Sequence, residues 1–91
     1  MYRRMIQELI ESCQTRQQIL PDEIERLING LDAQGFLDWI KDDREYSYYY
    51  YDAQQSGVCA KPREAAAIIL EAIALDSIQK VTEKPRRDEI Q

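Results

Sequence analysis

The chain has 91 residues, 44% of them hydrophobic, and its 17 acidic and 12 basic side chains give a net charge of −5 at pH 7. This length suits one domain with a small core, and the hydrophobic content is typical of a globular protein rather than a disordered one. Nine acids and three bases fall within residues 22–52. The negative charge disfavours loose attraction to nucleic acid or anionic lipid, so neither is an expected partner.

Two helices are predicted in the first third of the chain. Over residues 2–20, apolar side chains recur on one face at helical spacing and polar ones lie opposite. Pro21 ends this pattern, and a second helix is expected over 22–29. We expect Gly30 to take left-handed backbone angles and to cap the second helix.

The middle of the chain allows two interpretations. Residues 33–44 are predicted as a third helix with Asp32 as its N-cap. The alternative is a short β-hairpin in which 36–40 pairs with the tyrosine-rich segment 46–51, because tyrosine favours strands. The helix is favoured, since the capping residues agree with it and the hairpin lacks a turn glycine.

The last predicted helix runs from Pro62 to about Thr82, and ten of the eleven residues 65–75 are apolar. A helix that is apolar around its circumference has to be enclosed. We expect it to be the central helix of the fold or part of a homodimer interface. The candidate interface residues are Ile68, Ile69, Ala72 and Ile73. Residues 83–91 are expected to form a polar, frayed tail.

Together these elements predict a mostly α-helical protein, a small bundle of about four helices in a single domain over residues 1–82. The longest apolar run is far shorter than the roughly 18 residues that a membrane helix requires, and no signal-like stretch is recognised. A cytoplasmic protein without membrane attachment is therefore expected.

The reactive residues argue against catalysis. The chain has no histidine, and its two cysteines are too far apart for a metal-ligand pair. Cys13 is expected in the core, and Cys59 is the better candidate for a reactive thiol, although packing is favoured there too. The carboxylates match no calcium loop, and residues 54–57 are expected to be a plain loop. We expect no enzyme, no metal and no cofactor.

The strongest functional signal is an acidic, aromatic segment at about 38–52. Its neighbouring tyrosines point in different directions, so they cannot all be buried. Exposed tyrosines beside carboxylates suit recognition of an Arg- or Lys-rich surface by stacking, cation–π contact and charge pairing. The opposing interpretation is that the tyrosines only cover a thin core. The candidate partner-binding residues are Trp39, Asp42, Asp43, Glu45, Tyr46, Tyr48, Tyr49, Tyr50, Tyr51 and Asp52.

We therefore expect a non-catalytic binding or regulatory protein whose partner is another protein with a basic surface. An inhibitor that imitates the charge of nucleic acid is one form of this function. The alternative is a winged-helix DNA-binding regulator, with a recognition helix at 22–34, a wing from 36–40 and 46–51, and a C-terminal dimerisation helix. The acids of that recognition helix would repel phosphates, which disfavours the alternative.

Overall fold

The computed structural model describes residues 2–55 and 61–90, and the side chains of 2–55 and 61–79. Within these residues the chain forms five helices and no strand: α1 (Tyr2–Arg16), α2 (Pro21–Asn29), α3 (Ala33–Ile40), α4 (Ser47–Gln55) and α5 (Pro62–Ile90). The prediction of a mostly helical protein is confirmed. The predicted count of about four helices is too low, and the hairpin is not formed, because 36–40 lies in α3 and most of 46–51 lies in α4.

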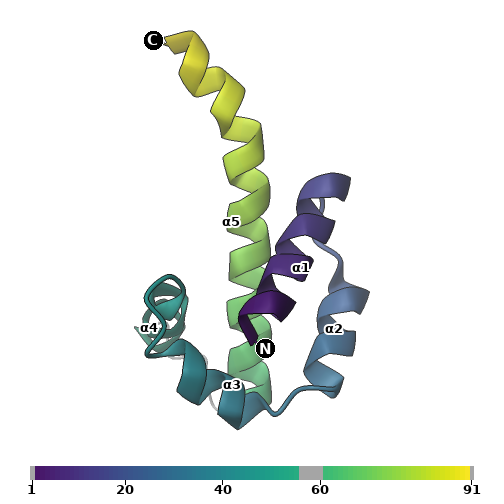
Figure 1. Ribbon diagram of the computed structural model, residues 1–91, viewed down its shortest axis with the longest axis vertical. Helices are drawn as coiled ribbons and strands as arrows, with labels where there is room; N and C mark the ends of the chain where they lie inside the picture. The colour runs from purple at the N-terminus through teal and green to yellow at the C-terminus, as the bar shows by residue number, and fades with distance from the viewer. Residues whose placement is uncertain (1, 56–60, 91) are drawn as a thin grey trace.

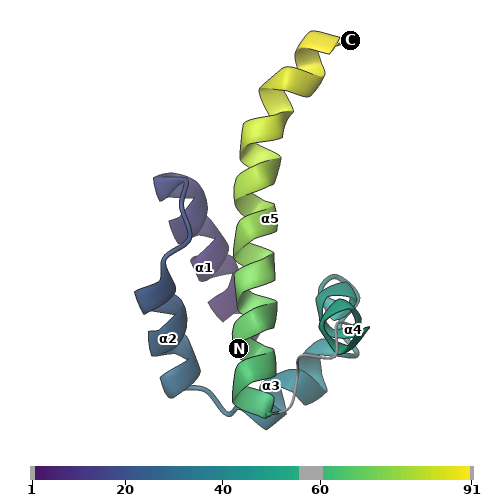
Figure 2. The same cartoon turned by 180° about the vertical axis from the view of Figure 1, so that it is seen from behind.

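The long helix α5 is the centre of the molecule (Figure 1). It contacts each of the other four helices, and among the remaining pairs the contact between α3 and α4 is the most extensive. The two views place α2 and α4 on opposite sides of α5, and its C-terminal end extends beyond the other helices (Figures 1 and 2). Seen from behind in Figure 2, one face of α5 is crossed by no other described helix.

The core lies along the inward face of α5. Its buried side chains there are Ala65, Ala66, Ile69, Leu70, Ile73 and Ala74. The small alanines let neighbouring helices approach closely, and the larger side chains fill the space between them. From α1, Ile6, Leu9 and Cys13 meet this face, each at most 1% exposed. The predicted core position of Cys13 is confirmed by this burial, which also raises the pKa of its thiol.

Helix α1 ends at Arg16, four residues before the predicted end. Gln17 has a φ of 56°, in the left-handed region, and the Gln18 N–H donates to the carbonyl of Cys13 at 3.3 Å. This is the hydrogen bond of a helix terminated by a left-handed residue, which is usually glycine. A glutamine at this position gives no such signal in the sequence. Ile19 lies beyond the helix end and still packs against the core.

The predicted start of the third helix is confirmed and the predicted cap of the second is wrong. Gly30 has a φ of −99° and so does not take left-handed angles. Asp32 is the N-cap of α3, and its carboxylate accepts a hydrogen bond from the Gly35 N–H at 3.3 Å. A Cβ at Gly35 would lie 2.7 Å from that carboxylate and 2.9 Å from the Tyr2 hydroxyl. Gly35 therefore leaves room for both the cap and the start of α1.

Helix α3 ends at Ile40 rather than at residue 44, and the side chain of Asp43 holds the turn that leads into α4. The Asp43 carboxylate accepts hydrogen bonds from the backbone N–H groups of Glu45 and Tyr46, at 2.9 and 3.0 Å. Carboxylates that satisfy free N–H groups in this way stabilise helix N-termini. Two of the residues expected in a loop, Gln54 and Gln55, form the end of α4, while the rest of that loop and Cys59 lie outside the described residues.

Helix α5 begins at Pro62 as predicted, and its backbone runs past Thr82 to Ile90. The single domain over 1–82 and the frayed nature of 83–91 stay predictions. In the portion of the chain described here, no helix combines the length and apolar character needed to cross a membrane.

The position of the core predicts different costs for two truncations on α5. Ile73 is 2% exposed and Leu75 is 44% exposed. We expect Ile73→Ala to lower the free energy of unfolding by about 2 to 5 kcal/mol, since it leaves a cavity in the core. Leu75→Ala should cost far less, and urea denaturation of the two variants compares them directly. Equal losses would mean that α5 is oriented differently.

Candidate functional site

The acidic, aromatic segment already binds an arginine of the same chain, Arg3 of α1. Its guanidinium donates to Glu45 Oε1 at 2.8 Å and to Asp43 Oδ1 at 2.5 Å. It also lies 6.0 Å from the ring centroid of Trp39 and 5.6 Å from that of Tyr46. The hydrogen bond to Glu45 raises the pKa of Arg3, so this side chain stays charged. The sequence predicted that this segment would bind an arginine of a partner through carboxylates and aromatic rings. In the structure the same groups bind Arg3 and so stabilise the fold.

Asp43 serves the fold rather than the surface. Its side chain is 6% exposed, and its two oxygens are taken up by Arg3 and by the backbone at the start of α4. Glu45 pairs with the same arginine but is 62% exposed, so it remains at the edge of the surface. The neighbouring Asp42 is exposed. The two adjacent aspartates, which the sequence does not distinguish, thus have different roles.

Two tyrosines of the run fasten α4 to the rest of the molecule. Tyr46 is 6% exposed, and burial raises its pKa. Tyr49 is partly buried, and its hydroxyl donates to Asp76 of α5 at 2.8 Å. Burial, together with this hydrogen bond, raises the pKa of Tyr49 far above its ordinary value. Trp39 is also partly buried, with its ring 5.6 Å from that of Tyr2.

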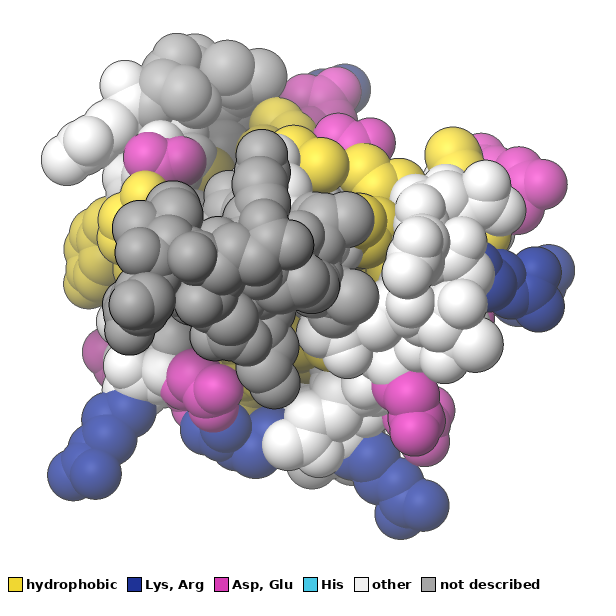
Figure 3. All heavy atoms as spheres, turned by 90° about the horizontal axis from the view of Figure 1, so that it is seen from above, with side chains coloured by type: hydrophobic (Ala, Val, Ile, Leu, Met, Phe, Trp, Pro, Cys, Tyr) yellow, Lys and Arg dark blue, Asp and Glu magenta, His cyan; other side chains and the backbone are white. Residues whose placement is uncertain are grey.

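The opposite face of α4 points to solvent. Tyr48 is 66% exposed and Tyr51 is 53% exposed. Asp52 and Gln55 are exposed at the matching helical positions, and we call these four residues the α4 outer face. From above, hydrophobic side chains are visible at the surface on the side where α4 lies in Figure 1 (Figure 3).

The ten candidate residues therefore divide into three groups. The exposed ones are Asp42, Glu45, Tyr48, Tyr51 and Asp52; the partly buried ones are Trp39, Tyr49 and Tyr50; and Tyr46 and the side chain of Asp43 are buried. The sequence pattern did not single out Arg3, whose role depends on the packing of α1 against α3 and α4.

The four residues predicted for a dimer interface lie on two faces of α5. Ile69 and Ile73 are 1% and 2% exposed and belong to the core of the chain itself. Ile68 and Ala72 are partly exposed, and Leu75, which was not among the candidates, is 44% exposed beside them. Only this second group is available to another molecule.

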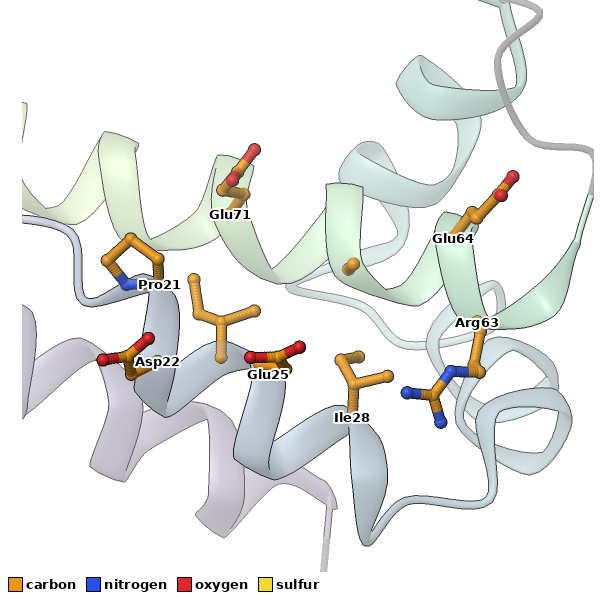
Figure 4. A pocket seen from close by; sticks show the side chains of 9 residues that line it. Pro21, Asp22, Glu25, Ile28, Arg63, Glu64 and Glu71 are labelled. Atoms are coloured by element: carbon orange, nitrogen blue, oxygen red, sulfur yellow. The ribbon is translucent and has the colours of Figure 1, made fainter.

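A groove that sequence reasoning did not find lies between α2 and α5 (Figure 4). It has a volume of about 400 Å³, and its lining residues are Pro21, Asp22, Ile24, Glu25, Ile28, Arg63, Glu64, Ala67 and Glu71. Isoleucines contribute apolar lining, and four carboxylates stand around it. The one basic side chain of the lining, Arg63, is engaged by a hydrogen bond to Asn29. The acids are visible in the sequence, but their convergence depends on how α2 packs on α5.

No group of three or more cysteine or acidic side chains within the described residues is arranged to hold a metal ion. The α4 outer face and the groove present aromatic, apolar and carboxylate side chains.

Comparison of the chain with protein-family models, with curated proteins and with solved structures found no match. The function is accordingly argued from these surfaces alone.

The different roles of the two aspartates give a stability prediction. Asp43→Ala should lower the free energy of unfolding by about 1 to 2 kcal/mol, because the turn before α4 loses two hydrogen bonds and Arg3 loses a partner. The matched variant Asp42→Ala should leave it nearly unchanged, because this side chain is exposed. Chemical denaturation followed by circular dichroism measures both. A larger effect at Asp42 would contradict the assignment.

The raised pKa of Tyr49 predicts a loss of stability at alkaline pH. Below its ordinary pKa of 10.0, both folded and unfolded chains keep the phenol proton. Above it the unfolded chain ionises first, so rising pH favours unfolding until the folded pKa is passed.

Tyr49→Phe should therefore reduce the fall in stability between about pH 9 and pH 11, although it removes a hydrogen bond at neutral pH. Tyr48→Phe, on an exposed ring, is the control. Urea denaturation across this pH range tests the difference, and an unchanged slope for Tyr49→Phe would refute it.

Proposed function

We propose that this chain is a non-catalytic protein-binding module that contacts a basic surface of a partner protein through the α4 outer face. The observation that carries the proposal is the exposure of two tyrosine rings on one face of α4, 66% for Tyr48 and 53% for Tyr51. Their neighbours Tyr46 and Tyr49 are engaged within the fold, so the opposing interpretation, that the run only covers a thin core, accounts for only part of it.

Exposed tyrosines are favourable anchors for a protein interface. A tyrosine ring brings a large apolar area and a hydroxyl, and it loses little conformational freedom when it is bound. On α4 the two rings lie one helical turn apart, and Asp52 follows directly. This combination supports binding to a surface that presents both flat apolar area and positive charge.

The charge of the surroundings supports a basic partner. Asp42, Glu45 and Asp52 are exposed around the tyrosines, where they outnumber the exposed Arg44, and the whole chain carries a net charge of −5. The contact of Arg3 with Trp39, Tyr46 and two carboxylates is an internal example of the same recognition chemistry. An inhibitor that covers the basic nucleic-acid site of another protein is one form of this function.

The DNA-binding alternative has less support. The described residues contain no strand, so the wing expected from 36–40 and 46–51 has no counterpart. The would-be recognition helix α2 carries Asp22, Glu23 and Glu25 against Arg26 alone. Such a helix would face the phosphate backbone with like charge.

Removal of the two exposed rings tests the proposal. We expect Tyr48→Ser with Tyr51→Ser to lose the partner captured by the unaltered protein from a lysate of the source cell and identified by mass spectrometry. Binding to the purified partner should weaken at least about tenfold, because interface tyrosines are common hot spots. The helical signal and melting temperature should change little, because both rings are exposed.

Leu75→Ser, which removes an exposed apolar side chain from α5, is the matched control and should bind normally. Asp52→Asn should mainly slow association and reduce its dependence on salt. Unfolding of the double tyrosine variant, or unchanged binding by a folded one, would contradict the proposal.

A further inference from the structure

The uncovered face of α5 carries an apolar stripe. Ile68, Ala72 and Leu75 follow one another at helical spacings of four and three residues, so they share one face. Ile68 and Ala72 are partly exposed, and Leu75 is 44% exposed. Viewed from behind, α5 has a face that no other described helix crosses (Figure 2). The stripe is thus an apolar helix face that the described part of the chain covers only in part.

Carboxylates flank this stripe and line the adjoining groove. Glu64 and Glu71 extend from α5 at the edge of the groove, while Asp22 and Glu25 lie on α2 (Figure 4). All four side chains are exposed, and none forms an ion pair with another side chain that the structure describes. Four carboxylates therefore stand against one basic side chain, Arg63, around a groove of about 400 Å³ whose lining includes Ile24, Ile28 and Ala67.

We propose that this face binds an amphipathic helix of a partner protein that carries lysine or arginine residues beside its apolar stripe. The apolar side chains of that helix pack on Ile68, Ala72 and Leu75. Its cationic side chains lay their methylene stems along the groove and bring their charged ends to the carboxylates, as long basic side chains do at apolar surfaces. Recognition of a basic amphipathic helix by an apolar, acid-rimmed surface is a common mode of peptide binding.

Charge selects this occupant over a second copy of the chain. A two-fold axis through the middle of the stripe would pass near Ala72 and place the Glu71 side chains of the two copies close together. Only Arg63 among the described residues that line the groove is basic, against four carboxylates, and like charges in a contact cost free energy. A basic helix turns the same carboxylates into favourable partners. Anionic lipid is disfavoured for the same reason as a second copy.

This surface is separate from the α4 outer face, because α2 and α4 lie on opposite sides of α5 (Figures 1 and 2). The inference therefore goes beyond the proposed function and stands or falls independently.

The test uses a synthetic amphipathic peptide of about 15 residues, with leucines on one helical face and lysines on the other. We expect the full chain to bind it, with the methyl signals of Ile68 and Leu75 shifting in NMR spectra. A peptide with glutamates in place of the lysines should not bind. Glu25→Gln with Glu71→Gln should weaken binding about tenfold, which corresponds to about 1.4 kcal/mol.

Two control variants distinguish binding at this site from the effect of the overall negative charge and from binding at the α4 outer face. Glu8→Gln with Glu11→Gln makes the same charge change on the exposed side of α1 and should alter binding less than about twofold. Tyr48→Ser with Tyr51→Ser should bind the peptide normally. Leu75→Lys, at an exposed position, should abolish binding without unfolding the chain.

Several results would overturn the inference. The first is that the peptide does not bind. The second is that the two double glutamate variants lose the same amount of peptide affinity. The third is that only the double tyrosine variant loses affinity. Sedimentation that finds a dimer dissociated by Leu75→Lys would assign the stripe to a second copy instead.

Discussion

The inward face of α5 is the surface on which the other four helices depend. Helices α1 to α4 span 15, 9, 8 and 9 residues, lengths at which isolated helices are marginal in water. Each of them buries its apolar side against α5, and contacts that avoid α5 are sparse apart from those between α3 and α4. Alanines at 65, 66 and 74 let neighbours approach closely. The packing on α5 leaves the α4 outer face and the apolar stripe of α5 free for other molecules.

Local sequence signals correctly predicted several features of the fold. These are the helical character, the break before α2 at Pro21, the Asp32 cap and the start of α5. The end of α1 was missed because a glutamine takes the left-handed angles at residue 17. Helix α4 was missed because four consecutive tyrosines hide its periodicity. Tyr46, Tyr49, Tyr50 and Ala53 do have the spacing of a helix face, and this spacing is the signal that would have distinguished α4 from a strand.

The composition of the sequence located the candidate segment, but it did not show which of its side chains face the solvent. Rotation of α4 about its axis decides which tyrosines are used internally, because residues three apart share a face and adjacent residues do not. Asp42 and Asp43 differ in the same way, since only the second binds Arg3 and the backbone of the turn before α4. Arg3 and the groove between α2 and α5 required tertiary structure, because the elements that form them are distant in sequence.

The order of the helices along the chain has a consequence for biosynthesis. The helix that holds the bundle together follows the other four, and α1 meets α5 across a separation of more than forty residues. As the chain leaves the ribosome, α1 to α4 emerge with their apolar faces uncovered and with little contact among themselves. Stable packing therefore has to wait for α5, and the interval before its arrival is when the nascent chain is most exposed to aggregation and to capture by chaperones.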